Sequence, residues 1–389
     1  MNVRRKSVHI VSRSGGLYAL SRVDVSRLFY PSTAEANAAT AAEPKTTHGG
    51  GGGNELGAME TVGPLPEPII HYQPFRPAAA ASSDRPTATF ALLGSTTKIL
   101  CSDAAGYTAV YDARARSFRA MPRRRWPKGP KCASVHIVRT AAHARADLEF
   151  DPWGCVDHDF FGEELRGEHA DSMYVLDLGQ DDEPCCSFEA LAYYPVRNWR
   201  WRPLPPPPFA GVDPGCTPPD DVAFAVTGGG TKICVSSATA TYLFDTVARE
   251  WSKAGDGDWV LPIHGKAEYV RKLGVWLGMS AWVPHSLCAL YLSAAAADMS
   301  GPPAMQHVRL DIDPPEEDWS PKKRALVNRG SGRFCIAKFC RTMDVSDDGD
   351  DGQVVVFTGV EVVAGGENGL SVVKHKSKCL VADGIEHVL

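Results

Sequence analysis

The sequence predicts an all-β fold built from a repeated sheet, and three observations lead to that prediction. Glycine (36 residues) and proline (29 residues) occur along most of the chain, as expected where turns join many short strands. Apolar runs of strand length recur between these turns. One strand-rich segment occurs twice. With 389 residues, of which 44% are hydrophobic, the chain is long enough to bury a large core.

The repeated segment is about 30 residues long. The first copy reads TFALLGSTTKILCSDAAGYTAVYDARARSF from Thr89, and the second reads AFAVTGGGTKICVSSATATYLFDTVAREW from Ala223. Equivalent residues lie 134 positions apart before a one-residue deletion and 133 positions apart after it. A register kept over this length indicates two copies of one structural unit. The equivalent pairs are Phe90 and Phe224, Lys98 and Lys232, Asp112 and Asp245, and Phe118 and Trp251.

Each copy contains three short apolar runs separated by turns and then a fourth aromatic position, which predicts a meander of four strands. A looser copy lies between them, from Met173 to Trp201. Four-stranded sheets that repeat in this way are typical of a β-propeller. Together with strand-like runs near both termini, they predict one domain over residues 1–389, a β-propeller of about five or six four-stranded blades closed by the N- and C-terminal strands. The four repeat aromatics are expected to pack between blades.

Two segments look unlike strands. Residues 33–60 are rich in Ala, Gly and Thr and include Gly49–Gly53, which predicts a disordered loop within the domain. Residues 344–352 form a short acidic run, which predicts a solvated loop.

Composition bounds the partners and the compartment. A formal net charge of −5 argues against nucleic acid as a partner. The basic start of the chain lacks the apolar segment of a signal peptide, and no apolar run approaches the ~18 residues of a membrane-spanning helix. The 11 cysteines are irregularly spaced and several lie in apolar runs, which favours reduced core thiols. We therefore expect a monomer in the cytoplasm or nucleus, without membrane attachment.

No segment predicts a catalytic, cofactor or metal site. His and acidic residues between Cys155 and Asp171 have no ligand spacing and are better explained as an exposed loop. Thr227–Lys232 reads TGGGTK but lacks the frame of a phosphate loop, so a turn is predicted. The proline run in Arg202–Phe209 favours a stiff connector over a ligand for an aromatic groove.

A basic run from Arg123 to Lys131 begins with Arg123, Arg124 and Arg125. Such runs occur in nuclear-import signals and in loops between blades, so these three arginines are a candidate nuclear signal.

Several sequence segments resemble those of a plant protein family, which is greatly expanded in grasses and catalogued as domain of unknown function 1668. They are Tyr174–Asp177, Phe188–Leu191, Trp199 and Trp201 leading into LPPPPF, FDTVAREW, GDWVLPIHGKAEYV, and Arg333–Ile336. The resemblance extends from Lys6 to Leu380 and implies a kelch-like fold. It carries no residue with a chemical role.

The leading functional hypothesis is a non-catalytic module that binds a protein partner through loops at one rim of the propeller. The alternative is a propeller enzyme that acts on a carbohydrate or another small molecule at a central channel. A third hypothesis is a nuclear regulatory role through the basic run.

Overall fold

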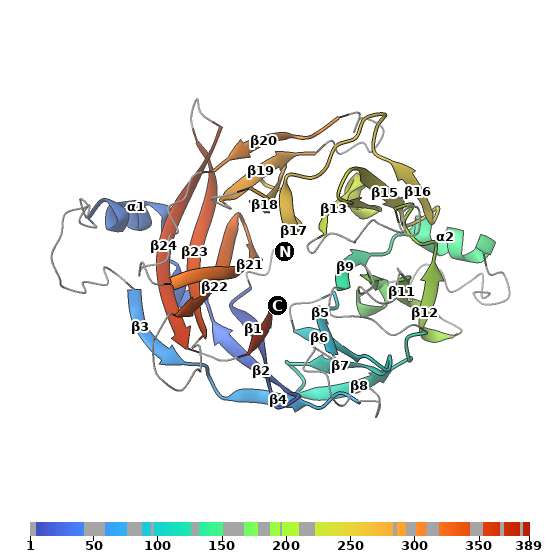
Figure 1. Ribbon diagram of the computed structural model, residues 1–389, viewed down its shortest axis with the longest axis horizontal. Helices are drawn as coiled ribbons and strands as arrows, with labels where there is room; N and C mark the ends of the chain where they lie inside the picture. Colours follow the sequence, from blue (N-terminus) through green and yellow to red (C-terminus); the bar gives the residue numbers. More distant parts are fainter. Residues whose placement is uncertain are drawn as a thin grey trace. The chain divides into compact units, whose positions relative to one another are not determined.

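The computed structural model confirms that the fold is all-β, with the four-stranded antiparallel sheets of a β-propeller (Figure 1). It describes residues 5–42, 59–75, 88–94, 97–125, 132–150, 167–177, 187–194, 197–209, 222–282, 286–292, 301–308, 319–342, 353–365, 369–381 and 384–389. These residues form five sheets of four or more strands. Among them, no helix has the length and apolar character needed to cross a membrane. The predicted acidic loop at 344–352 lies outside the described residues.

The chain divides into two compact units, which are described separately here. The first holds Met1–Gln73, Tyr269–Ala289 and Gln306–Leu389, and the second holds Pro74–Glu268 and Leu290–Met305. The single domain over residues 1–389 stays a prediction. Three strands contain residues of both units: β17 (Ile263–Val270), β19 (Leu287–Tyr291) and β20 (Ala304–His307).

The first unit contains the two ends of the chain. Its elements are β1 (Ser7–Ser14), β2 (Leu17–Asp24), η1 (Ser26–Leu28), α1 (Thr33–Ala42), β3 (Met59–Pro64), β4 (Pro68–Tyr72), β18 (Val275–Ser280), β21 (Trp319–Gly330), β22 (Arg333–Thr342), β23 (Gln353–Gly365), β24 (Gly369–Val381) and β25 (Ile385–Val388).

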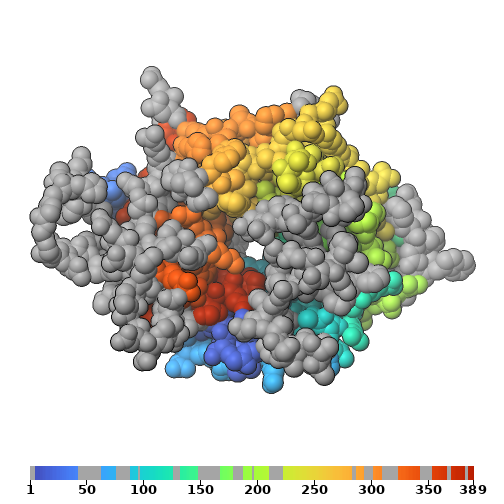
Figure 2. Space-filling view, in the orientation of Figure 1, coloured from blue at the N-terminus to red at the C-terminus, as the bar shows by residue number. Residues whose placement is uncertain are grey.

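The C-terminal strand β25 pairs with β1 in the sheet β25-β1-β2-β4, so the two terminal strands pair as predicted. Figure 2 shows the red C-terminal residues directly against the blue N-terminal ones. A second sheet of this unit has the order β21-β22-β23-β24-β3, with β3 parallel to β24. Val8, Ile10, Phe339 and Phe357 are buried in one core cluster of this unit.

The second unit contains three meanders of four strands. Its elements are β5 (Ala88–Leu92), β6 (Lys98–Asp103), β7 (Thr108–Asp112), β8 (Ser117–Met121), β9 (Cys132–Val138), α2 (Ala141–Phe150), η3 (Gly167–Ala170), β10 (Asp171–Asp177), β11 (Ser187–Tyr194), β12 (Asn198–Leu204), β13 (Ala223–Thr227), η4 (Gly228–Gly230), β14 (Lys232–Ser236), β15 (Thr241–Asp245) and β16 (Glu250–Lys253). In each meander, every strand pairs antiparallel with the next one along the chain; the three meanders are β5–β8, β9–β12 and β13–β16. Strand β17 runs parallel to β13.

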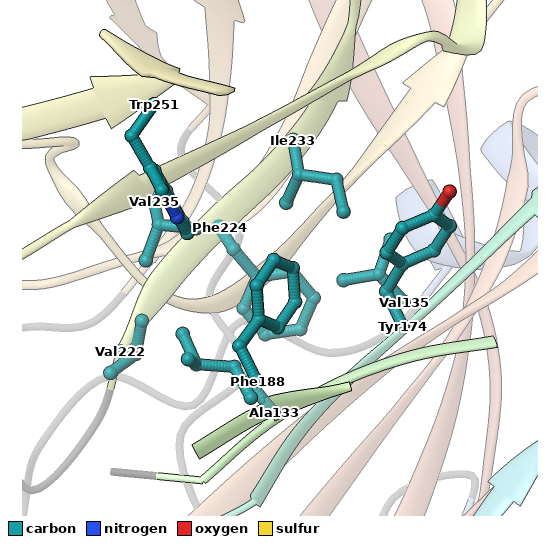
Figure 3. Close-up of a pocket in the computed structure, with 10 residues that line it drawn as sticks. Ala133, Val135, Tyr174, Phe188, Val222, Phe224, Ile233, Val235 and Trp251 are labelled. Carbon is teal, nitrogen blue, oxygen red and sulfur yellow. The ribbon is translucent and has the colours of Figure 1, made fainter. Parts of the chain in front are cut away.

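The sheets β9–β12 and β13–β16 pack through an apolar layer. Figure 3 shows side chains of both sheets converging on one space, with Tyr174 and Phe188 from the first sheet and Phe224 and Ile233 from the second. The cavity left between them is only about 10 Å³, room for a single water molecule at most. Because its lining is almost entirely apolar, this space is a core between sheets and not a ligand site.

The predicted disorder of residues 33–60 is wrong for its first part, because Thr33–Ala42 forms helix α1. The reason is a serine cap just ahead of the helix. The Ser32 hydroxyl accepts a hydrogen bond from the Glu35 amide at 3.2 Å, and the Ser32 hydroxyl and Glu35 carboxylate are 3.0 Å apart. Alanine-rich sequence then propagates the helix. Residues 43–58 lie outside the described residues, and Met59 and Glu60 begin strand β3.

One buried histidine should make the stability of the protein depend on pH. His9 is 2% exposed on β1, and burial, followed by the charges of Arg5 and Arg22, lowers its pKa from 6.5 to about 4. Between these pH values the unfolded chain binds a proton that the folded chain does not bind. The free energy of unfolding is therefore expected to fall by roughly 2 kcal/mol between pH 7 and pH 5 through His9 alone.

Urea unfolding at both pH values measures this effect. His9→Leu should remove that part of the pH dependence, whereas an equal dependence in the variant would show that His9 does not titrate as expected.

Candidate functional site

The structure places the repeat residues at matching positions of two sheets. Lys98 pairs across the strands with Asp112, as Lys232 does with Asp245. The one-residue deletion falls in the hairpin that follows the second strand. The hydroxyls of Ser102 and Thr108 are 3.2 Å apart there, and those of Ser236 and Thr241 in the second copy are 2.9 Å apart.

The repeated aspartates build the same turn in both copies. Asp112 Oδ1 accepts hydrogen bonds from the amides of Arg114 and Ala115 at 2.8 and 3.1 Å. Asp245 Oδ1 accepts bonds from the two equivalent amides at 2.9 Å each. Aspartate favours such turns because its short side chain reaches the backbone two residues on. The repeated carboxylate therefore has a structural role in each sheet.

The expectation that all four repeat aromatics pack between sheets is wrong for Phe118. Phe90 and Phe224 are 6% and 8% exposed, and Trp251 packs on Phe188 of the adjacent sheet at 5.6 Å. Phe118 is 52% exposed and contacts Tyr111 of its own sheet, with ring centroids 5.0 Å apart. Both β8 and β16 are edge strands, so the difference arises from the neighbouring sheet: Phe188 packs on Trp251, whereas Phe118 faces solvent.

The glycine segment forms the predicted turn, and the proline segment contacts the next sheet. Gly228–Gly230 form a short 3₁₀ turn that leads into strand β14 and not into a helix. The Trp251 indole donates a hydrogen bond to the carbonyl of Pro205 at 2.9 Å, so the proline connector is held on the next sheet.

The three arginines of the candidate nuclear signal have different surroundings. Arg124 is 5% exposed and lies 4.6 Å over the ring of Trp201, where burial lowers its pKa. Arg123 and Arg125 are exposed. A receptor for basic segments needs several accessible cations, whereas here the middle one is buried. The nuclear signal stays a prediction.

The His and acidic segment lies partly within the described residues. His169 stacks on Tyr193 with ring centroids 3.8 Å apart, and Asp171 pairs with His136 at 2.9 Å between Oδ1 and Nε2. In the part of the chain that the structure describes, no three His, Cys, Asp or Glu side chains are grouped to hold a metal ion. The residues from Cys155 to Glu164 lie outside it.

A candidate interaction surface lies at the end of sheet β5–β8. It consists of Phe75, Tyr107 and Arg123, here called the aromatic–arginine patch. Phe75 and Tyr107 are 56% and 50% exposed, and their rings meet edge to face at 5.7 Å. The Arg123 guanidinium lies 4.8 Å from the centre of the Tyr107 ring. Two large aromatic side chains and an arginine are thus gathered at the surface of the second unit.

The backbone beneath the patch is held by one buried carboxylate. Asp103, which is 3% exposed, accepts hydrogen bonds from the amides of Phe75 at 3.0 Å and Tyr107 at 2.8 Å. Arg123 Nε donates to the carbonyl of Ala105 at 2.9 Å. At Gly106, with φ +87°, any Cβ would lie 2.9 Å from the Arg124 carbonyl, so only glycine is accommodated there.

Sequence analysis missed the aromatic–arginine patch because its parts are distant along the chain. Asp103 lies 28 residues from Phe75, and Arg123 lies 18 residues from Ala105. The signal that the sequence does contain is Tyr107, an aromatic residue in the hairpin between two predicted strands, where a side chain is expected to face solvent.

Comparisons with solved structures return proteins of low similarity. A structural genomics protein of unknown function from Bacteroides thetaiotaomicron is 10% identical over 69% of this chain and 57% of its own, with a TM-score of 0.35. The putative TolB from Agrobacterium tumefaciens is 9% identical over 76% and 84%, with a TM-score of 0.35. The WD40 domain of SCAP from fission yeast is 8% identical over 82% and 69%, with a TM-score of 0.30. This chain thus spans less than two thirds of the first of these proteins. Similarities this low say nothing about function.

No curated protein matches the chain. A family described as "Protein of unknown function (DUF1668)" matches residues 5–380, nearly the whole sequence. The chain therefore belongs to the DUF1668 family of proteins of unknown function.

Proposed function

We propose that this protein is a non-catalytic interaction module, and that the aromatic–arginine patch binds an extended acidic segment of a protein partner. The observation that carries the proposal is the exposure of Phe75 and Tyr107 on a backbone fixed by Asp103. Tyrosine and arginine are, with tryptophan, the residue types enriched among energetically dominant interface positions. A patch that is already ordered loses little conformational entropy when a partner binds.

Charge favours an acidic partner. Arg123 and Arg125 are both exposed, and the sequence continues with Lys128 and Lys131. Opposite charge around an apolar centre raises the association rate and disfavours basic competitors. The partner segment we propose therefore carries Asp or Glu next to one apolar or aromatic side chain.

The test is selection from a displayed library of random peptides on the full-length protein. We expect enrichment of acidic sequences with an aromatic or aliphatic anchor. Their affinity should fall at least tenfold, or about 1.4 kcal/mol, in Tyr107→Ala. This substitution keeps the amide that bonds to Asp103 and removes only the exposed ring.

Phe118→Ala is the matched control, since Phe118 is 52% exposed in the same unit and outside the patch. Equal binding of the selected peptides to Tyr107→Ala and Phe118→Ala would contradict the proposal that the aromatic–arginine patch is their binding site. A library that yields no enriched sequence would contradict the interaction module itself.

The kelch-like assignment, the plant origin and residence in the cytoplasm or nucleus belong to the same proposal. What supports a kelch-like blade is the glycine run Gly228–Gly230 ahead of β14, followed by Tyr242 on β15 and Trp251 on β16. Kelch blades carry a glycine pair ahead of a tyrosine and a tryptophan.

A further inference from the structure

A second feature of the same unit is a cavity of about 160 Å³ between sheets β5–β8 and β9–β12, here called the polar cavity. Its apolar floor consists of Leu93, Val110, Met121 and Trp199, which are 3 to 9% exposed. An engineered cavity of about 150 Å³ in another protein holds a benzene molecule. The polar cavity as a whole therefore has room for a small ligand with an apolar group of about the size of one six-membered ring.

The repeat supplies an internal comparison for the wall of the polar cavity. In the second copy, the Lys232 ammonium lies 3.5 Å from Asp245 Oδ2 within one sheet. In the first copy, Lys98 turns away from the equivalent Asp112 and pairs with Glu168 of η3, which also pairs with Arg119 at 3.2 Å. Asp112 thus faces the cavity without the lysine that its counterpart has.

Asp112 keeps only its turn contacts. Its Oδ1 accepts the amides of Arg114 and Ala115, and in the part of the chain that the structure describes no side-chain cation reaches its carboxylate. One carboxylate oxygen is therefore available at the position where Asp245 holds an ammonium group.

A second carboxylate lines the same space. Asp171 bonds to His136 at 2.9 Å and lies against Gly94, where a Cβ would be 1.9 Å from Asp171 Oδ2. Gly94 has a φ of +72°, so the backbone and the absent side chain both leave room for this carboxylate.

The charges of the wall favour a cation. Lys98 and Arg119 contribute two positive charges, and Asp112, Glu168 and Asp171 contribute three negative ones. Glu168 is shared by the two cations, whereas the Asp112 carboxylate has neither. A single ammonium would bring the wall to neutrality.

We propose that the polar cavity binds a primary ammonium carried on a short apolar body. The ammonium takes beside Asp112 the place that Lys232 takes beside Asp245, and the apolar body covers Leu93, Val110 and Met121. This site is separate from the aromatic–arginine patch and does not depend on it. The same chemistry is offered by a free arylalkyl amine and by the lysine side chain of a peptide.

The test is titration calorimetry of the full-length protein with benzylamine, with Nα-acetyl-lysine methylamide, and with benzyl alcohol as the uncharged match to benzylamine. We expect at least one of the two ammonium ligands to bind, and any binding of benzyl alcohol to be at least tenfold weaker. Tighter binding of benzylamine would indicate a free arylalkyl amine as the natural ligand, and tighter binding of Nα-acetyl-lysine methylamide would indicate a peptide lysine. This comparison needs no variant, so it holds even if a substitution prevents folding.

Asp112→Asn removes the charge and keeps the Oδ1 acceptor of the turn, and it should weaken the ammonium ligand at least tenfold. Asp245→Asn is the matched control at the equivalent repeat position and should leave the affinity unchanged. The proposal is overturned if neither amine binds, if benzyl alcohol binds as tightly as the amine, or if Asp112→Asn behaves like Asp245→Asn.

Discussion

Replacing Asp147 with alanine is expected to lower the free energy of unfolding by about 3–5 kcal/mol, the effect of leaving a buried charge without its partner. The Asp147 side chain, on helix α2, is 5% exposed and pairs with Arg139 and Arg249. Arg202 lies 3.6 Å away. The Arg139 side chain is also 5% exposed, and its guanidinium lies 5.1 Å from the centre of the Tyr194 ring.

The loss follows from the burial of Arg139, whose guanidinium cannot regain water when the carboxylate is removed. Arg139 belongs to the segment after β9 and Arg249 to the turn between β15 and β16, so Asp147 joins α2 to two sheets. His143 on the same helix adds a bond from Nε2 to the Thr246 hydroxyl at 2.8 Å.

Urea unfolding followed by tryptophan fluorescence measures this loss. The control is Asp258→Ala, which breaks an exposed pair with Lys253 at 2.7 Å and should leave the unfolding midpoint unchanged. If the midpoint of Asp147→Ala equals that of the control, the buried ion cluster does not stabilise the unit.

The second large effect is expected at Phe244, where substitution by alanine should cost about 3–5 kcal/mol. Phe244 is fully buried and packs edge to face on Phe188 at 4.8 Å and against Trp251 at 5.0 Å. Alanine would remove these ring contacts and leave a cavity in a core whose remaining space is only about 10 Å³.

Phe118→Ala provides the comparison, because the Phe118 ring is 52% exposed and its removal opens no cavity. The difference in urea midpoint between Phe244→Ala and Phe118→Ala checks the prediction directly. Equal midpoints would mean that the layer between β9–β12 and β13–β16 contributes little to the stability of the unit.

The repeat could be predicted in register because its information is local. A hairpin of two short strands fixes which residues face each other, and a shift by one residue would exchange the two faces of every strand. The pairs Lys98–Asp112 and Lys232–Asp245 were therefore accessible from spacing alone. The helix at Thr33–Ala42 was also accessible from the sequence, since Ser32 followed three residues later by Glu35 is the pattern of a helix N-terminus.

The surroundings of each repeat position could not be predicted in the same way. Phe118 and Trp251 are equivalent in sequence, yet a neighbouring sheet packs on Trp251 through Phe188 and Phe118 stays exposed. Lys98 leaves its repeat partner for Glu168, 70 residues further along the chain. No local pattern indicates which of two equivalent side chains will meet such a distant neighbour.

The sequence by itself determined the all-β class and the four-stranded repeat unit, because alternation and turns act over a few residues at a time. The pairing of the terminal strands followed from the propeller class that the repeat predicts, and not from any local pattern. Only the tertiary structure decided where exposed aromatics gather on Asp103 and where Asp112 faces a cavity instead of a lysine. Those features depend on side chains brought together from separate sheets and hairpins, and burial and charge pairing select them only after the sheets have packed.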